Sequence, residues 1–389
     1  MSVVWRVLRT EGLLSVRDRA LDRIAEARRR RSFSPAPESW RPEPVRVLHL
    51  SATPPAPRLG GVQAHLLRSL DANSALLYPE TGGWRLEVQG QALTFPGLPP
   101  SPVALEDEAF ERAVRSAVGV LGATALHVEG LAGLPPLSLL RFQDLELTLS
   151  LHDFAAFCPR PHLLERPQLR FCFYSRDLDR CGRCLRQDWP VEDELQAERR
   201  AIAAELLATA SSLIFPSEFL RRTYNELFPG LPPERQRVVP PLGGQAVPLP
   251  PPSGPVRHVA LVGGVQAHKG ALVFEEVARR REDLRWTVYG GGDPVILARL
   301  RRLPNVRIRG YYRNGTLPRL LREDGVDLAL LLSIVPESYS LVLDECAAAG
   351  VPVVAFELGA VPERLRSGRL VPLEDGAEGI IEALRRRES

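Results

Sequence analysis

Lysine is almost absent from this sequence, because Lys269 is the only lysine among 50 lysine and arginine residues in a chain of 389. An ammonium group is a compact point charge on a flexible stem, whereas a guanidinium group is a rigid planar fork. Where arginine takes every other basic position, the exception favours a function that needs an ammonium, such as a contact with a phosphate. Chance survival of one lysine is the alternative interpretation.

Long apolar runs are also missing. No stretch approaches the roughly 20 apolar residues that span a bilayer, and the N-terminus lacks the apolar core and cleavage site of a secretory signal. We therefore expect a protein that stays in the cytoplasm. Five cysteines, an odd number without an export signal, argue against a disulfide framework and leave metal binding or buried thiols as the alternatives.

An excess of charge of one sign is missing too. The formal net charge is +3, which is small for this length and creates no protein-wide field that attracts nucleic acid. Aromatic and basic residues are not interleaved as they are in many nucleic-acid-binding proteins. We therefore expect no nucleic acid partner, although the arginine-rich N-terminus and a Cys-x-x-Cys pair are features that would suit one.

The length favours two domains. From residue 45 on, short β-rich runs alternate with helical stretches, which is typical of βαβ units around a parallel sheet. The strand candidates are VRVLHLS, ALHVEG, LELTLSLHD, SSLIFPS, HVALVGG, LRWTVYGGG, VRIRGYY, DLALLLS and VPVVAFELG. The proline-rich segment 247–256 is the strongest linker candidate. The sequence predicts an α/β protein with two tandem Rossmann-like domains, 45–246 and 257–389, and a cleft between them that the strand carboxyl ends face.

Residues 1–31 combine apolar residues at helical spacing with many arginines, and a proline-rich link up to residue 44 follows. We predict a basic amphipathic helix here. Such a helix binds the headgroup region of an anionic membrane, which would place the protein on the inner face of the membrane. A solvated helix that packs on its own domain explains the pattern equally well.

Lys269 lies in a glycine-bearing loop between a predicted strand and a predicted helix, within VALVGGVQAHKGALVF. Gly263 and Gly264 allow the backbone to approach a phosphate closely, and amides at a helix N-terminus stabilise an anion. Glycine-rich turns of this kind are also common as purely structural features.

Two glutamates are spaced for a nucleotide-sugar in the segment 334–356. Glu337 lies in a polar turn after a predicted strand, and Ser338 or Ser340 can cap the helix that follows. Glu345 comes eight residues after Glu337, which separates the two carboxylates by roughly 10 Å along a helix. With a diphosphate at the helix N-terminus, Glu337 would reach sugar hydroxyls while Glu345 accepts hydrogen bonds from a ribose.

Glu337 and Glu345 form the Glu-x7-Glu motif of the family-4 retaining glycosyltransferases, which this chain resembles from Val45 onward. Lys269 falls where those enzymes carry a phosphate-binding lysine. The resemblance implies the GT-B fold, a nucleotide-sugar donor, and a metal-independent transfer with retention of configuration. The donor contacts that it implies come from Gly61, Gly263, Gly264, Lys269, Ser338, Tyr339, Ser340, Leu341 and Glu345.

Further segments carry the resemblance. LHLSATPPAPRLGGVQAHL looks like the family's first strand and glycine loop, and LIFPSEFLRRTY looks like its PSxF turn. His152 falls where the family places a histidine beside the transferred sugar. HKG and PESYSLVLDECAAAGVPVVAFELGA are similar to the subgroup that builds bacterial surface polysaccharides. The family usually has an arginine at the position of Gly264, so either the neutralisation of the donor phosphates is weaker here or an arginine from elsewhere in the chain substitutes for it.

A cysteine cluster lies within an insertion that we place at 154–190. Its members are Cys158, Cys172, Cys181 and Cys184. The last two have the spacing of a zinc knuckle, and a structural zinc would tie down this loop. Unligated thiols and redox chemistry are the alternatives.

Two other interpretations compete with sugar transfer. A sugar-nucleotide epimerase of the same fold would bind a similar donor and rearrange it without an acceptor, and a catalytically inactive scaffold in polysaccharide assembly would not consume the donor at all. The Glu-x7-Glu pattern favours transfer. For a transferase the resemblance implies a saccharide or lipid-linked saccharide as acceptor and no cofactor for catalysis.

Overall fold

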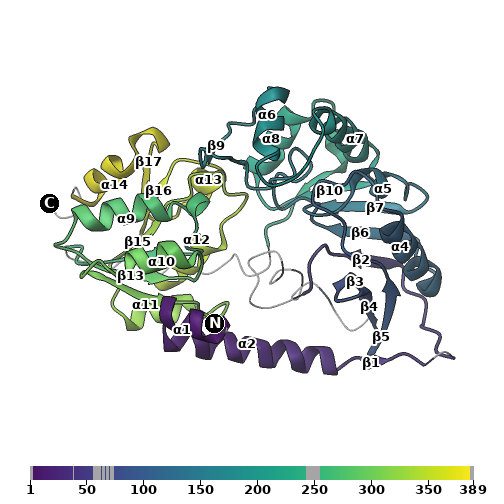
Figure 1. The fold of residues 1–389 in the computed structure, drawn as a ribbon, viewed down its shortest axis with the longest axis horizontal. Helices are drawn as coiled ribbons and strands as arrows, with labels where there is room; N and C mark the ends of the chain where they lie inside the picture. Colours follow the sequence, from purple (N-terminus) through teal and green to yellow (C-terminus); the bar gives the residue numbers. More distant parts are fainter. Residues whose placement is uncertain are drawn as a thin grey trace. The chain divides into compact units, whose positions relative to one another are not determined.

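Figure 1 shows the computed structural model, which describes residues 3–37, 39–55, 63, 66, 70, 74–241 and 255–385. By their contacts the residues form two units, one of Met1–Ala25 with Leu242–Ser389 and the other of Glu26–Pro241. Each unit contains one main sheet. Most of the predicted linker at 247–256 and the predicted glycine loop with Gly61 lie outside the described residues.

The sheet of the first unit consists of parallel strands. They are β12 (His258–Val262), β13 (Arg285–Tyr289), β14 (Val306–Gly310), β15 (Leu328–Leu331), β16 (Val353–Phe356) and β17 (Gly368–Val371). Their order is β14-β13-β12-β15-β16-β17. This is the order of a Rossmann sheet, in which the first and fourth strands are neighbours where the strand order reverses. Here these strands are β12 and β15, so the loops that follow them come together.

Helices cover both faces of this sheet (Figure 1). They are α9 (Ala271–Arg280), α10 (Pro294–Leu300), α11 (Leu317–Glu323), α12 (Leu341–Ala349), α13 (Val361–Arg364) and α14 (Gly376–Arg385), with short 3-10 helices η2 (Ala267–Lys269) and η3 (Leu373–Asp375). Along β12, Val259 and Leu261 pack with α9, α10 and α14, whereas Ala260 and Val262 pack with α11 and α12. Because both of their faces are buried, the central strands β15 and β16 are continuously apolar and β12 is nearly so, which made them recognisable in the sequence.

The N-terminal segment forms two helices, α1 (Val3–Thr10) and α2 (Leu13–Arg31), where the sequence predicts one. Gly12 separates them with a φ of 93°, a conformation that glycine adopts without steric cost. The prediction of one continuous helix is therefore wrong, although the helical character of the segment is confirmed.

Helix α2 turns its polar side toward the sheet of the first unit. Asp18 forms a buried ion pair with Arg309 at 2.8 Å, and Asp22 accepts a hydrogen bond from the hydroxyl of Tyr311. The exposed side chains of α1 and α2 include large apolar ones, namely Val3, Trp5, Leu8, Leu13, Leu14, Leu21 and Ile24. The usual arrangement of a surface helix, apolar side inward and polar side outward, is thus reversed.

The sheet of the second unit is mixed. Its strands are β1 (Ser34–Pro35), β2 (Val47–Leu50), β3 (Ala75–Glu80), β4 (Gly83–Val88), β5 (Gln91–Pro96), β6 (Ala125–Glu129), β7 (Glu146–Ser150), β10 (Ser212–Phe215) and β11 (Gln236–Val238). The order is β1-β5-β4-β3-β2-β6-β7-β10-β11. Strands β3, β4 and β5 form an antiparallel meander that the sequence analysis did not predict. Strands β2 and β6 are parallel neighbours at the reversal of strand order, as β12 and β15 are in the other sheet.

The helices of this unit are α4 (Glu108–Leu121), α5 (Pro136–Leu140), α6 (Leu178–Leu185), α7 (Leu195–Thr209) and α8 (Glu218–Leu227), with the 3-10 helix η1 (Pro233–Arg235). A separate two-stranded sheet of β8 (Leu164–Glu165) and β9 (Arg170–Phe171) lies in the predicted insertion. Every strand candidate from the sequence contains a strand of the structure, which confirms the alternating α/β pattern.

Candidate active site

Lys269 and Glu337 form the centre of the candidate site. Nζ of Lys269 lies 2.7 Å from Oε1 of Glu337, and the two side chains are 32% and 12% exposed. Lys269 ends η2 after β12, and Glu337 lies in the loop after β15. Because β12 and β15 are parallel neighbours, the strand order brings these loops together. The structure thus joins two residues that the sequence analysis assigned separately to a donor.

Contacts between the two loops fix their approach. The amide of Ile334 donates a hydrogen bond to the carbonyl of His268 at 2.9 Å, and the hydroxyl of Ser333 donates to the same carbonyl at 3.2 Å. Gly270 has a φ of 73°, and a Cβ there would lie 1.7 Å from the carbonyl oxygen of Leu332. A larger residue at position 270 would push the loops apart.

Glu337 is held as a carboxylate. Burial tends to raise its pKa, but the charge and hydrogen bond of Lys269 outweigh burial and keep the pKa below its usual range. Its backbone is also fixed, since the amide of Ala360 donates to its carbonyl at 2.7 Å and a Cβ at Gly359 would lie 2.4 Å from its nitrogen. The site therefore presents a fixed anion beside a cation, which suits a ligand with hydroxyl groups next to phosphates.

Helix α12 begins shortly after Glu337. Ser340 occupies the N-cap position with a φ of 68°, in the left-handed region that serine rarely adopts, and its side chain makes no capping hydrogen bond. Ser340 thus takes the predicted position without making the predicted side-chain bond. A helix N-terminus whose cap side chain makes no hydrogen bond to the first amides is suited to bind an anion.

Tyr339 lies under Arg364, whose guanidinium carbon is 3.3 Å from the ring centroid. Arg364 also forms an ion pair with Asp344 at 2.7 Å. The Tyr339 side chain is therefore buried within the unit, whereas Ser338 and Leu341 on either side of the turn are only half-buried. The side chains of Ser338 and Leu341 are thus more accessible to solvent than that of Tyr339.

Glu345 lies in α12 and is half-buried. Burial and, next, the negative charge of Glu345 raise the pKa of Tyr312 well above its usual value. The neighbouring Cys346 is fully buried, as the sequence analysis expected. A contact of Glu345 with a ribose stays a prediction.

The loop after β12 has space at Gly264. Gly263 has a φ of 107°, which favours glycine, but Gly264 is exposed and a Cβ there would meet no atom within 4 Å. Packing in the described part of the chain therefore does not exclude the arginine that similar enzymes have at this position.

In the second unit, the pairing of β2 with β6 brings two histidines and one glutamate together. His49 on β2 is the register partner of His127 on β6, and Glu129 follows two residues later on the same face. Oε1 of Glu129 lies 3.0 Å from Nδ1 of His49 and 3.6 Å from Nε2 of His127. Nε2 of His152, which follows β7, lies 3.9 Å from Oε2 of Glu129. The predicted site residue His152 is thus held beside a buried carboxylate.

The carboxylate of Glu129 stays ionised in this group. Burial tends to raise its pKa, but its contacts with His152 and His49 outweigh burial and hold the pKa well below its usual range. His152 was predictable from the sequence, whereas His49, His127 and Glu129 were not predicted, although the His-x-Glu alternation on one strand is a signal for two side chains on one face. Within the described residues, the ligand atoms of His49, His127 and Glu129 form the only group of potential metal ligands all within 4.8 Å.

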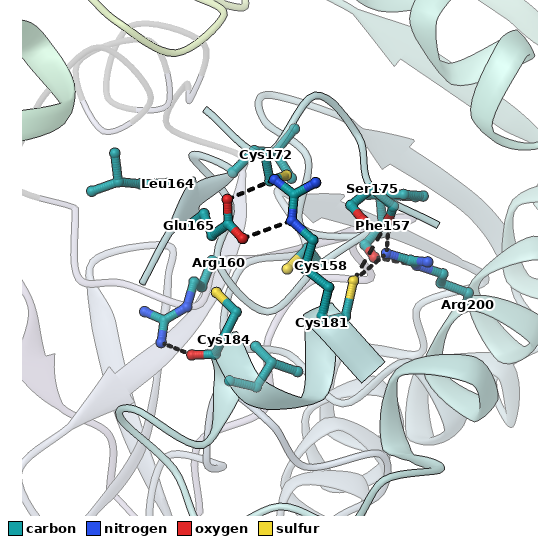
Figure 2. A pocket seen from close by; sticks show the side chains of 13 residues that line it. Phe157, Cys158, Arg160, Leu164, Glu165, Cys172, Ser175, Cys181, Cys184 and Arg200 are labelled. Carbon is teal, nitrogen blue, oxygen red and sulfur yellow. Dashed lines mark hydrogen bonds and ion pairs between the residues drawn. The ribbon is translucent and has the colours of Figure 1, made fainter. Parts of the chain in front are cut away.

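The four cysteines of the predicted cluster line one pocket in the second unit (Figure 2). They are Cys158, Cys172, Cys181 and Cys184, and all are free thiols. Burial raises the pKa of Cys158 to about 12 and also raises the pKa of Cys172. The fold therefore brings together the residues that the sequence analysis assigned to a metal.

Residues 257–387 match the model of a family described as Glycosyl transferases group 1. No curated protein sequence matches the chain at a significant level. The matched segment contains Lys269, Glu337 and Glu345.

Several solved structures are similar to this one over most of the chain, although their sequence identity is low. A sucrose-phosphate synthase from Thermosynechococcus elongatus is 16% identical, with 88% of this chain and 89% of that chain covered and a TM-score of 0.58. WaaG, a glycosyltransferase involved in lipopolysaccharide biosynthesis, is 14% identical, with 87% and 90% covered and a TM-score of 0.55. HepE from Anabaena, in complex with UDP, is 14% identical, with 88% and 96% covered and a TM-score of 0.52. The chain therefore has the GT-B fold of two Rossmann-like domains, and residues 257–387 are similar to the glycosyl transferases group 1 family.

Proposed function

We propose that this protein is a retaining glycosyltransferase of family 4, which moves a sugar from a nucleotide-sugar to a hydroxyl group of an acceptor. The observation that carries the proposal is the ion pair of Lys269 and Glu337, which lies just before α12 at the reversal of strand order in a Rossmann sheet. The match of residues 257–387 to the group 1 family supports it. UDP bound to HepE, a protein of similar fold, supports a nucleoside diphosphate as part of the donor.

The donor diphosphate binds, in this proposal, at the N-terminus of α12. Lys269 and the first amides of the helix stabilise the charge that develops on the leaving diphosphate. Glu337 accepts hydrogen bonds from hydroxyls of the transferred sugar, and Glu345 accepts them from the ribose. The acceptor hydroxyl attacks from the side on which the diphosphate leaves, so configuration at the anomeric carbon is retained. With an ammonium and helix amides in this role, the transfer needs no divalent cation.

His152 keeps the role that the resemblance implies, beside the transferred sugar. The contact with Glu129 supports a fixed orientation of its ring, because a carboxylate beside one ring nitrogen determines where the other nitrogen points. Glu129 and His152 both belong to the second unit. The role of His152 beside the sugar is a prediction.

We further propose a saccharide or lipid-linked saccharide as acceptor, in the synthesis of a bacterial surface polysaccharide or glycolipid. The exposed apolar side chains of α1 and α2 support a place on the inner face of the membrane. Exposed arginines stand among them, including Arg6, Arg9, Arg17, Arg23 and Arg28. Apolar side chains that enter the acyl boundary and arginines that meet anionic headgroups bind a membrane surface together. No helix in the described part of the chain is long and apolar enough to cross a membrane.

Incubation with a panel of sugar nucleotides and saccharide acceptors tests the proposal. A retaining transferase releases the nucleoside diphosphate and forms a product with the anomeric configuration of the donor, which NMR reads directly. An epimerase would convert the donor without any acceptor, and an inactive scaffold would bind a nucleoside diphosphate but leave every donor intact. A product of inverted configuration would contradict retention.

A further inference from the structure

The cysteine-bearing segment of the second unit has no part in the proposed transfer, yet it encloses a pocket (Figure 2). Cys158 precedes the two-stranded sheet of β8 and β9, and Cys172 follows that sheet directly. Cys181 and Cys184 both lie in α6, three residues apart in sequence, and so project from one side of the helix. A small hairpin and one helix thus bring four thiols from separate positions to one pocket.

Donors surround the sulfur atoms. The amide of Arg166 donates to Sγ of Cys184 at 3.3 Å, and Nη2 of Arg200 donates to Sγ of Cys181 at 3.5 Å. Arg180 also lines the pocket, where it forms an ion pair with Glu165 at 2.6 Å. Amide and guanidinium groups of this kind stabilise thiolates and offset the negative charge of a metal with four thiolate ligands.

The backbone around the pocket is held in an uncommon conformation. Leu163, Leu169, Phe173 and Tyr174 have φ values between 52° and 56°. Non-glycine residues adopt this left-handed region only where their surroundings over-determine it. Phe173 is itself 67% exposed, and its ring centroid lies 4.6 Å from that of Phe171. A crosslink between the two ends of the hairpin and α6 would add to the constraint that this ring contact supplies.

We propose that Cys158, Cys172, Cys181 and Cys184 bind one zinc ion. Zinc binds four thiolates in a tetrahedron with Zn–S distances of about 2.3 Å. The four thiols release their protons to solvent as the metal binds. No three of these sulfur atoms, all of which belong to described residues, lie within 4.8 Å of one another. The sulfur atoms therefore move closer together as zinc binds.

The zinc ion also anchors the loop that carries His152. Cys158 lies six residues after His152. The carbonyl of Phe157 accepts a hydrogen bond from Nε2 of Gln196 on α7 at 2.8 Å, which fixes the loop on one side of Cys158. The metal fixes the loop on the other side, because it links Cys158 to Cys172 after β9 and to the two cysteines of α6. Loss of zinc should then loosen His152 while the two main sheets stay intact.

Elemental analysis of the full chain, expressed with zinc and purified without chelator, tests the proposal. We expect about one zinc per chain. A mercurial reagent that reacts with thiolates should release this zinc in step with the reaction of the pocket cysteines. Cobalt in place of zinc should give the intense visible bands and sulfur-to-cobalt charge-transfer bands of a tetrahedral thiolate site.

Matched variants locate the metal. Cys181→Ser with Cys184→Ser should lose zinc, whereas Cys346→Ala, at a buried cysteine on α12, should keep it. Zinc that persists in the double variant and disappears in His127→Ala would place the metal at the histidine and glutamate group of β2 and β6, and would overturn the proposal. Wild-type protein that binds no zinc and has four mercurial-reactive pocket thiols would overturn it as well. If the double variant does not fold, the mercurial titration of the wild type decides the question.

Discussion

Lys269 and Glu337 are 68 residues apart in the sequence, yet Nζ and Oε1 lie 2.7 Å apart. The pair forms because β12 and β15, which precede the two loops, are neighbours in the sheet. Removal of one member leaves the other charge half-buried without its partner, which costs stability as well as function. Each activity measurement on a variant of this pair therefore needs a thermal unfolding curve beside it.

Substitutions of Glu337 and Glu345 should separate turnover from nucleotide binding. Glu337→Gln removes the charge that we propose to face the sugar, so kcat should fall about 100-fold while the Kd of the free nucleoside diphosphate changes little. Glu345→Ala should weaken binding of the nucleoside diphosphate about tenfold, because a hydrogen bond to a charged acceptor is lost. Donor kinetics and calorimetry measure the two effects. Unchanged nucleoside-diphosphate affinity in Glu345→Ala would contradict its assignment to the ribose.

An arginine at position 264 should improve donor binding. The site has space for it, and a guanidinium beside the diphosphate would add a charge-assisted hydrogen bond. We expect Gly264→Arg to lower the Kd of the nucleoside diphosphate about tenfold. Gly263→Ala, whose backbone would be strained at a φ of 107°, is the control and should weaken binding. Calorimetry that finds no gain in Gly264→Arg would show that the diphosphate does not lie beside this loop.

The stability of the second unit should depend on the ionised Glu129. Its pKa is lowered in the folded protein, so its contribution is present above the unfolded pKa of about 4.3 and is lost as the pH falls toward the folded value. Glu129→Gln should reduce the free energy of unfolding at pH 7 by about 1–3 kcal/mol. The difference between wild type and variant should shrink below about pH 4. Denaturant unfolding from pH 7 to pH 3 checks this, with Glu108→Gln on the exposed face of α4 as control. A difference that stays constant over this range would contradict the charge assignment.

Exposed apolar residues of α2 should control binding to anionic vesicles. Leu13→Gln with Leu21→Gln and Ile24→Gln keeps the buried acidic side of the helix and removes only the exposed apolar side. Vesicle binding should weaken at least tenfold, since each apolar side chain contributes about 1.5–3 kcal/mol when fully buried. Leu98→Gln, at a residue of the other unit that is 73% exposed, is the matched control. Sedimentation at low and high salt measures the effect, and equal pelleting of both variants would exclude a membrane surface on α2.

The strand pattern was predictable because buried parallel strands are continuous apolar runs. HVALV and LALL, which form β12 and β15, could be read directly from the sequence. The motif residues Lys269 and Glu337 were recognised by spacing and residue type. Their ion pair was not predicted, because it depends on strand order, and strand order is a property of the whole sheet.

The outward direction of the apolar side of α2 was equally beyond the sequence. Periodicity defines two sides of a helix but does not say which one faces the protein. Arg309 and Tyr311, which lie almost 300 residues later, provide partners for Asp18 and Asp22 and so turn the acidic side inward. The histidine group around Glu129 was missed for the same reason, since His49 and His127 become neighbours only when β2 pairs with β6.

The value of kcat/KM for nucleoside-diphosphate release by Lys269 variants tests the proposed function most directly. Lys269→Ala removes the ammonium proposed to stabilise the leaving diphosphate, and we expect a loss of about 100- to 1000-fold with a fold that stays intact by circular dichroism. Lys269→Arg keeps the charge but not the compact shape, and we expect it to be poor as well. Turnover near the wild-type value in Lys269→Arg would show that the single lysine is a chance survival. Turnover near the wild-type value in Lys269→Ala would contradict the proposed donor site itself.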